Sequence, residues 1–149
     1  MGGFLRISEA ANIAIHSMAY IAVKGRNGFV SVSQIAEDIG VSSAHLSKVL
    51  QRLVKSGLLT STRGAKGGFL LKRDPGSVSL LEILEAVEGP VPVTSCLLKN
   101  PVCKSGKCVL TNLLKDVDAL VRDYLGNTQL SEFMEHLDVQ GKKKTKRRK

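Results

Sequence analysis

The stretch VSVSQIAEDIGVSSAHLSKVLQRLVKSGLLTSTRGAKGGFLL, residues 30–71, predicts two helices joined by a tight turn. Ser31 and Gln34 have the spacing of a capping box ahead of a short helix, which Gly40 ends. Ser42 can cap a second helix, in which apolar residues recur at helical spacing. These residues are Leu46, Val49, Leu50, Leu53 and Val54. The opposite face is polar and basic, with His45, Lys48, Gln51, Arg52 and Lys55.

Two short strand-like runs follow at residues 58–62 and 68–73, and a glycine-rich segment with two basic residues joins them. A further helix is predicted before the stretch, at residues 7–24, because apolar residues recur there at helical spacing. This order of helices followed by a hairpin is typical of a winged helix-turn-helix. We therefore expect a mainly α fold with a small β-hairpin wing.

A helix of this kind fits the major groove of double-stranded DNA, where its first residues reach the base edges. The residues expected there are Ser43, His45, Ser47 and Lys48. Arg52 lies further along the helix and suits a phosphate. The hairpin tip can place Arg63 and Lys66 at the DNA backbone or in the minor groove, and glycines such as Gly67 let the backbone N–H groups come close. The alternative is that the basic face is simply solvated, as most charged helix faces are.

The net charge of +9 is unevenly distributed along the 149 residues. Residues 1–73 carry ten Lys and Arg against three Asp and Glu, whereas residues 74–141 carry five against ten. The basic N-terminal half predicts a nucleic-acid partner. The last eight residues, KKKTKRRK, carry seven basic groups. This tail either adds salt-dependent, non-specific DNA affinity or is solvated without consequence.

Several protein classes are disfavoured by the same sequence. No signal peptide and no run of about 18 apolar residues are present, so we expect a cytoplasmic protein without a membrane partner. Gly-rich nucleotide loops and catalytic-triad spacings are missing, which argues against an enzyme. Aromatic residues make up only 4%, which argues against base stacking on single strands.

The C-terminal half predicts a different role. Ser79 and Glu82 have capping-box spacing ahead of a short helix, and Gly89 with two prolines ends it. From Val109 onward a long helix carries a heptad-like seam of Leu110, Leu114, Val117, Val121 and Tyr124, widened by Leu113, Leu120 and Leu125. Its outward positions are expected to be Lys115, Asp116, Asp118, Arg122 and Asp123. The seam predicts a homodimer, with packing in a monomer core as the alternative. We expect three regions: a DNA-binding domain at 1–75, a connecting and dimerisation region at 76–138, and a disordered tail at 139–149.

All three cysteines, Cys96, Cys103 and Cys108, fall within thirteen residues. In a reducing compartment, clustered cysteines favour metal or redox chemistry over structural disulfides. The spacing lacks the C-x2-C pairs of structural zinc sites. Thiolates are also the ligands of iron–sulphur clusters, and a thiol switch or inert cysteines remain equal alternatives on spacing alone.

The chain resembles the Rrf-two family of bacterial winged-helix regulators, which includes IscR-, NsrR- and CymR-like members. The resemblance rests on LRISEAANIAIHSMAYIA, on the 30–71 stretch, on VSLLEILEAVEG, and on a three-cysteine segment after that helix. It implies a homodimeric regulator, a repressor, that binds a promoter operator. It also implies a [2Fe-2S] or [4Fe-4S] cluster on Cys96, Cys103 and Cys108 that senses iron, oxygen or nitric oxide. The alternative within the family is a cluster-free member controlled by thiol oxidation or by a protein partner.

Two departures from the family pattern concern the fourth cluster ligand and DNA recognition. IscR-like members place a His three residues after the last cysteine, where this chain has Thr111. NsrR-like members use an acid from the first helix of the other subunit, so the candidates are Asn12 of the partner subunit, Glu9 of the partner subunit or an external ligand. Ser47 stands where IscR-like members have Glu, which predicts a different operator.

Overall fold

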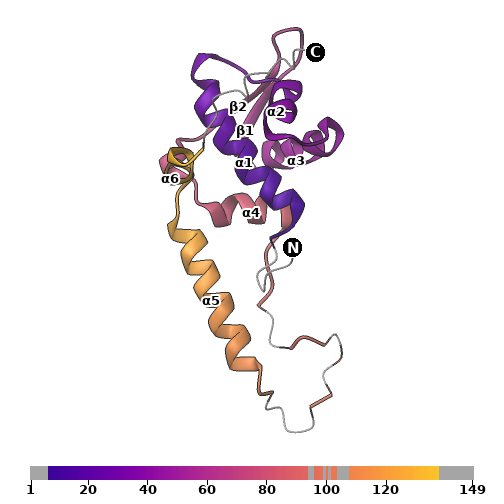
Figure 1. The fold of residues 1–149 in the computed structure, drawn as a ribbon, viewed down its shortest axis with the longest axis vertical. Coiled ribbons are helices and arrows are strands. Elements are labelled where there is room, and N and C mark those ends of the chain that lie inside the picture. The colour runs from indigo at the N-terminus through magenta and orange to yellow at the C-terminus, as the bar shows by residue number, and fades with distance from the viewer. Residues whose placement is uncertain (1–6, 94–95, 99, 101, 104–107, 138–149) are drawn as a thin grey trace, which may run out of the picture.

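The computed structural model describes residues 7–93, 96–98, 100, 102–103 and 108–137. The elements are α1 (Glu9–Lys24), η1 (Gly25–Asn27), α2 (Val32–Ile39), α3 (Ser43–Lys55), β1 (Leu59–Thr62), β2 (Gly68–Leu71), η2 (Pro75–Ser77), α4 (Leu80–Glu88), α5 (Thr111–Asn127) and α6 (Leu130–Glu135). Helices α1–α4, the hairpin and α6 form a head, and α5 projects away from it (Figure 1). The predicted mainly α fold with a hairpin wing is confirmed. In the described ranges, no helix is long and apolar enough to cross a membrane.

Helix α1 is the centre of the head. It packs against α2, α3, α4, α6 and β2. The sequence predicts one apolar stripe on this helix, but Ile13, Tyr20 and Ile21 are buried as well, as expected for a helix with neighbours on most sides. Ile7, which the same pattern includes, precedes the helix and is 42% exposed. The hydroxyl of Tyr20 donates to Asp38 and thereby joins α1 to α2.

Helices α2 and α3 begin and end as the sequence predicts. The Ser31 side chain accepts the N–H of Gln34 at 3.3 Å, and Gly40 ends α2 with a left-handed φ of 73°. Ser42 accepts the N–H of His45 at 3.5 Å and caps α3. The predicted apolar stripe of α3 faces the core, with Leu46, Val49, Leu50 and Leu53 at most 2% exposed.

The wing is a two-stranded antiparallel hairpin in which Leu59 pairs with Leu71 and Thr62 with Gly68. Val30 extends its base, because the backbone N–H and C=O of Val30 and Phe69 exchange two hydrogen bonds of 2.9 Å. Gly68 lies so close to this contact that a Cβ there would be 2.3 Å from the Val30 carbonyl oxygen. The close approach explains why glycine is needed at the base of the wing.

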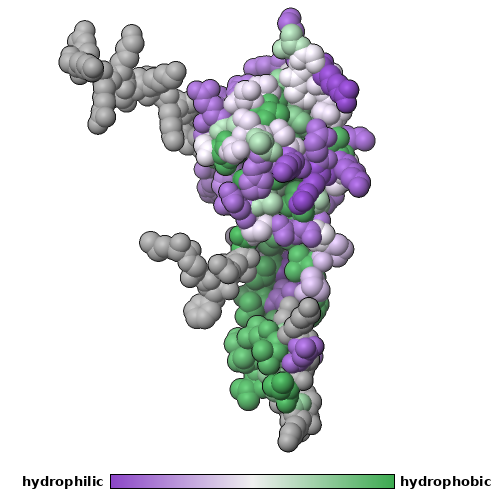
Figure 2. Space-filling model, turned by 90° about the vertical axis from the view of Figure 1, so that its right-hand side faces the viewer, coloured by the Kyte–Doolittle hydropathy of each residue, from purple (hydrophilic) through white to green (hydrophobic). Residues whose placement is uncertain are grey.

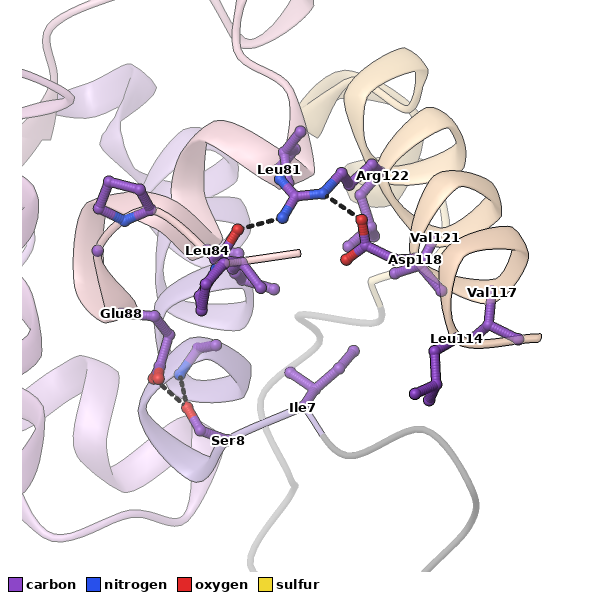
Figure 3. Close-up of a pocket in the computed structure, with 16 residues that line it drawn as sticks. Ile7, Ser8, Leu81, Leu84, Glu88, Leu114, Val117, Asp118, Val121 and Arg122 are labelled. Atoms are coloured by element: carbon purple, nitrogen blue, oxygen red, sulfur yellow. Dashed lines mark hydrogen bonds and ion pairs between the residues drawn. The ribbon is translucent and has the colours of Figure 1, made fainter. Parts of the chain in front are cut away.

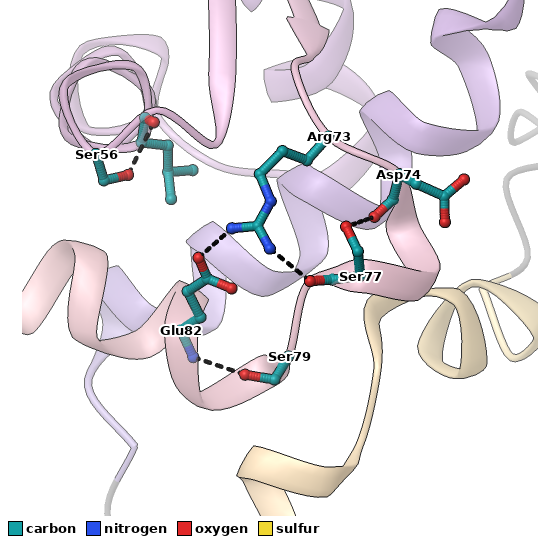
Figure 4. Close-up of polar contacts among 7 residues, drawn as sticks. Ser56, Arg73, Asp74, Ser77, Ser79 and Glu82 are labelled. Carbon is teal, nitrogen blue, oxygen red and sulfur yellow. Dashed lines mark hydrogen bonds and ion pairs between the residues drawn. The ribbon is translucent and has the colours of Figure 1, made fainter.

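Two backbone hydrogen bonds join the start of α4 to the turn between α5 and α6. Leu80 N–H donates to Thr128 O at 3.0 Å, and Leu130 N–H donates to Val78 O at 2.8 Å. The loop before α4 is fixed by Arg73, which binds the Glu82 carboxylate and the Ser77 carbonyl (Figure 4). The polypeptide therefore returns to the head after α5.

Helix α5 carries one broad apolar surface, as the widened seam predicts, and the head covers only part of it. Leu125 is 8% exposed and packs toward α4, and Leu114 and Val121 line a groove on the same side. The adjoining part of this surface has heptad spacing and is exposed; it consists of Leu110, just before α5, and of Leu113, Val117, Leu120 and Tyr124, of which Val117 also borders the groove. Figure 2 shows hydrophobic side chains gathered on the projecting part, below a mostly hydrophilic head. We call these five residues the α5 stripe.

Candidate functional site

The first turns of α3 present the polar side chains that the sequence singles out. Ser43 and Lys48 are exposed, and His45 and Ser47 are half-buried. The Ser47 hydroxyl donates to the Ser43 carbonyl at 2.7 Å, so its oxygen lone pairs remain free to accept. His45 Nδ1 lies 3.8 Å from a carboxylate oxygen of Glu9 at the start of α1. This places an acid beside the helix face that is predicted to enter the groove.

Arg52 is exposed on α3 and has a partner within the chain. Its Nη1 donates to the carbonyl of Val87 in the last turn of α4, at 2.8 Å. Carbonyls in the last turn of a helix lack a partner within that helix, and a cation there also complements the helix dipole. This bond occupies Nη1, and the phosphate contact predicted from the sequence for Arg52 stays a prediction.

The wing tip keeps its two cations free. Arg63 and Lys66 are exposed, and neither pairs with a carboxylate among the residues that the structure describes. The tip turn is closed by the Gly67 N–H, which donates to Gly64 O at 2.9 Å. A Cβ on Gly67 would lie 2.5 Å from the Thr62 carbonyl oxygen, so this turn requires glycine. The arrangement holds both basic side chains at one end of the molecule.

The cysteine segment, residues 96–108, joins α4 to α5. Cys96 Sγ accepts the N–H of Leu98 at 3.4 Å. At the start of α5, the backbone of Leu110 donates to the Cys108 sulphur, and this lowers the pKa of the thiol. Thr111 and the Cys103 side chain also hydrogen bond to Cys108 and act in the same direction. The start of α5 thus stabilises the Cys108 thiolate, the form in which cysteine binds metal.

The structure brings Cys103 and Cys108 together, but it does not gather a complete ligand set. Within the described ranges, no group of three His, Cys, Asp or Glu side chains could hold a metal ion. Glu9 lies beside His45 on the head. Asn12 is exposed on α1, and its carbonyl accepts a hydrogen bond from His16 Nδ1 at 2.8 Å. The disordered tail predicted at 139–149 lies outside the described residues.

A half-open groove of about 430 Å³ separates α5 from α1 and α4. Leu81, Leu84, Leu114 and Val121 supply much of its apolar lining (Figure 3). Arg122 crosses it from α5, with Nε donating to Asp118 at 2.8 Å and Nη1 lying 3.6 Å from Glu85.

The sequence predicts that Asp118 and Arg122 point outward, and this is wrong. Their side chains are 22% and 28% exposed, respectively. Both face α4 rather than solvent because α5 leans on α4 along this side. The sequence did not predict the contact of Arg122 with Glu85 or that of Glu9 with His45, because these partners are distant in the chain. Only the i,i+4 spacing of Asp118 and Arg122 is a local signal.

Comparison with known proteins agrees with this architecture. A family model described as Rrf2, an iron-dependent transcriptional regulator, matches residues 7–136. The HTH-type transcriptional regulator IscR of Enterobacter sp. (strain 638) is 32% identical over 144 residues, which cover 95% of this chain and 88% of that protein.

Solved structures give the same result. The chain resembles CymR, the global cysteine regulator of B. subtilis, with a TM-score of 0.76 and 26% identity, over 91% of this chain and 100% of that one. It resembles IscR of T. potens with a TM-score of 0.72 and 26% identity, over 89% and 88% of the two chains. The chain belongs to the Rrf2 family of winged-helix, DNA-binding transcriptional regulators, which are not enzymes.

Proposed function

We propose that the protein is a homodimeric repressor that binds a promoter operator and holds an iron–sulphur cluster on Cys96, Cys103 and Cys108. One observation carries the proposal: the cysteine segment connects the DNA-binding head to α5, and its sulphur atoms meet hydrogen-bond donors. A group bound there would touch the connection between the two parts of the chain. Occupancy of the segment could then change the relative placement of two heads in a dimer.

The proposed DNA interface combines α3 with the wing. Ser43, His45, Ser47 and Lys48 would face base edges, because the first turns of a recognition helix enter the major groove. Arg63 and Lys66 would bind phosphates, and Gly67 keeps the tip compact enough for its backbone to approach the duplex. Their exposure and the absence of internal ion partners among the described residues support this assignment.

The proposed dimer interface is the α5 stripe. Its exposed fractions run from 41% at Leu110 to 69% at Leu120, beside the part of the helix that already packs against the head. A continuous apolar stripe at heptad spacing is the usual contact surface of paired helices. Burial by a second copy would remove this surface from water.

The donor set fits an iron–sulphur cluster at three positions. Such clusters are held by thiolates and tuned by hydrogen bonds to sulphur, and the N–H groups of Leu98 and Leu110 supply such bonds. Its nuclearity, [2Fe-2S] or [4Fe-4S], depends on the fourth ligand. The candidates are Asn12 of the partner subunit and Glu9 of the partner subunit. A bound cluster would supply sensitivity to iron, oxygen or nitric oxide.

Anaerobic purification tests the cluster directly. We expect a coloured protein with iron and acid-labile sulphide, and loss of both in Cys103→Ser. Val102→Ala is the matched control, because Val102 is 74% exposed in the same segment and offers no ligand. A colourless, iron-free wild-type protein that still binds its promoter would contradict the cluster. If the wild-type protein holds a cluster, separate Glu9→Ala and Asn12→Ala substitutions should show, from the change in the visible spectrum, whether either residue is the fourth ligand.

A cluster-free thiol switch is the second candidate, because Cys103 and Cys108 hydrogen bond to each other. Treatment of the apoprotein with peroxide would oxidise the two thiols to a disulfide and reduce peroxide to water. Peptide mapping by mass spectrometry would detect the link. This candidate requires that the disulfide change operator affinity, and it is excluded if Cys103→Ser responds to peroxide like the wild type.

A further inference from the structure

Two arginines bind carbonyl groups on either side of the turn that follows α4. Arg52, from the DNA-reading helix α3, donates to Val87 O at 2.8 Å. Arg122, from α5, donates through Nη2 to Val91 O. We call residues 87–91 the 87–91 turn. It therefore has one partner from the helix expected to contact DNA and one from the helix that follows the cysteine segment.

The chemistry of the turn explains both contacts. Val87 lies in the last turn of α4, where carbonyls lack helical partners and a positive charge is favoured. Gly89 then takes a positive φ of 82°, which directs the chain out of the helix toward Val91. Each carbonyl accepts a charge-assisted hydrogen bond, which is stronger than a neutral one.

Arg122 is held firmly on its own side. Its Nε donates to Asp118 one turn earlier in α5, and its Nη1 lies 3.6 Å from Glu85 in α4. The side chain is only 28% exposed, so these bonds are partly shielded from water. A shift of α5 would move the guanidinium against α4 and the 87–91 turn together. Because α4 also packs against α3, a movement of the turn would reach Arg52.

We propose that Arg52 and Arg122 are positioning residues that couple α5 and the cysteine segment to α3 through the 87–91 turn. The meaning of this coupling for regulation rests on the proposed function, whereas the coupling itself does not require a cluster. It passes through two identified side chains on opposite sides of one turn. A substitution of either arginine should therefore change amide exchange on the other side of the 87–91 turn.

Hydrogen–deuterium exchange on the cluster-free protein tests the coupling. Arg122→Met keeps the aliphatic stem and removes the guanidinium. We expect amide exchange in the last turn of α3, residues 52–56, to rise about tenfold, since a charge-assisted bond to the turn is lost. Arg122→Lys should restore part of the protection. Lys115→Met removes an exposed cation from the same helix and should leave α3 unchanged.

The reciprocal variant is Arg52→Met, with Lys55→Met as its control in the same helical turn. We expect faster exchange at residues 89–93 only in Arg52→Met. Unchanged exchange in α3 of Arg122→Met would overturn the coupling. A uniform rise that includes α2 would overturn it too, because this would report a general loss of stability.

Operator binding gives the second readout. The quantity compared is the ratio of the operator dissociation constants with and without the cluster. If this ratio differs from one by the factor of five or more that is typical of coupled sites, Arg122→Met should bring it within about twofold of one. Adding Arg52→Met should change the ratio no further, as expected for residues in one pathway. An unchanged ratio in Arg122→Met would contradict the coupling. If the wild-type ratio is one, the proposed sensing fails, and the exchange data alone decide the coupling.

Discussion

The wing tip offers the sharpest prediction about DNA binding. Arg63→Ser combined with Lys66→Ser removes two exposed cations that have no carboxylate partner in the described part of the chain. A dimer on its operator then loses up to four phosphate contacts. Each contact contributes about 0.9 to the slope of log affinity against log salt, so the slope should fall by roughly 3.6.

Fluorescence anisotropy with a labelled promoter duplex, between about 50 and 200 mM salt, measures this slope. Stability should stay within about 0.5 kcal/mol of the wild type, because neither side chain makes a buried contact. Thermal unfolding therefore separates lost DNA contact from lost fold. Lys115→Ser is the control, since this exposed cation lies on α5, away from the wing. A double variant with the wild-type slope would refute the assignment of the wing to phosphate contact.

Three further predictions concern the dimer, pH and thiol chemistry. Leu120→Lys should give monomers by sedimentation with unchanged helix content, because Leu120 is 69% exposed in the single chain; persistent dimers would place the interface elsewhere. Burial, followed by the hydrogen bond to Asp38, raises the pKa of Tyr20 from 10.0 to about 12. Because the unfolded chain ionises first, stability should fall by roughly 2–3 kcal/mol as pH rises from about 10 to about 12. Urea unfolding of Tyr20→Phe should lack this part of the decline, and identical declines would contradict it. The Leu110 backbone lowers the pKa of Cys108, so iodoacetamide near pH 7 should label Cys108 faster than the other cysteines in the apoprotein, and equal rates by mass spectrometry would contradict this.

Local signals were sufficient to predict much of the head. Ser31, Ser42 and Ser79 all cap the helices that they were expected to cap, and Gly40 ends α2 in the left-handed conformation. These features depend on residues within one helical turn of each other, so local sequence spacing is enough to predict them. The α3 stripe is similar, because its spacing of 3 and 4 fixes one face toward the core.

The features that could not be predicted from the sequence depend on contacts between residues far apart in the chain. The apolar surface of α5 is broad, so periodicity alone cannot tell which part of it meets α4 and which part remains exposed. The predicted seam therefore mixed Val121, which lines the groove, with Tyr124, which is 67% exposed. Arg52 and Val87 are 35 residues apart, and no spacing rule links them.

One titration tests the central claim most directly. A single anaerobic preparation is titrated with its promoter duplex, first with its cluster and again after the cluster has been removed by a chelator. We predict that the two dissociation constants differ by a factor of about 5 to 150, the usual range for coupled sites. Equal constants for both forms would contradict the claim that the cysteine segment controls DNA binding.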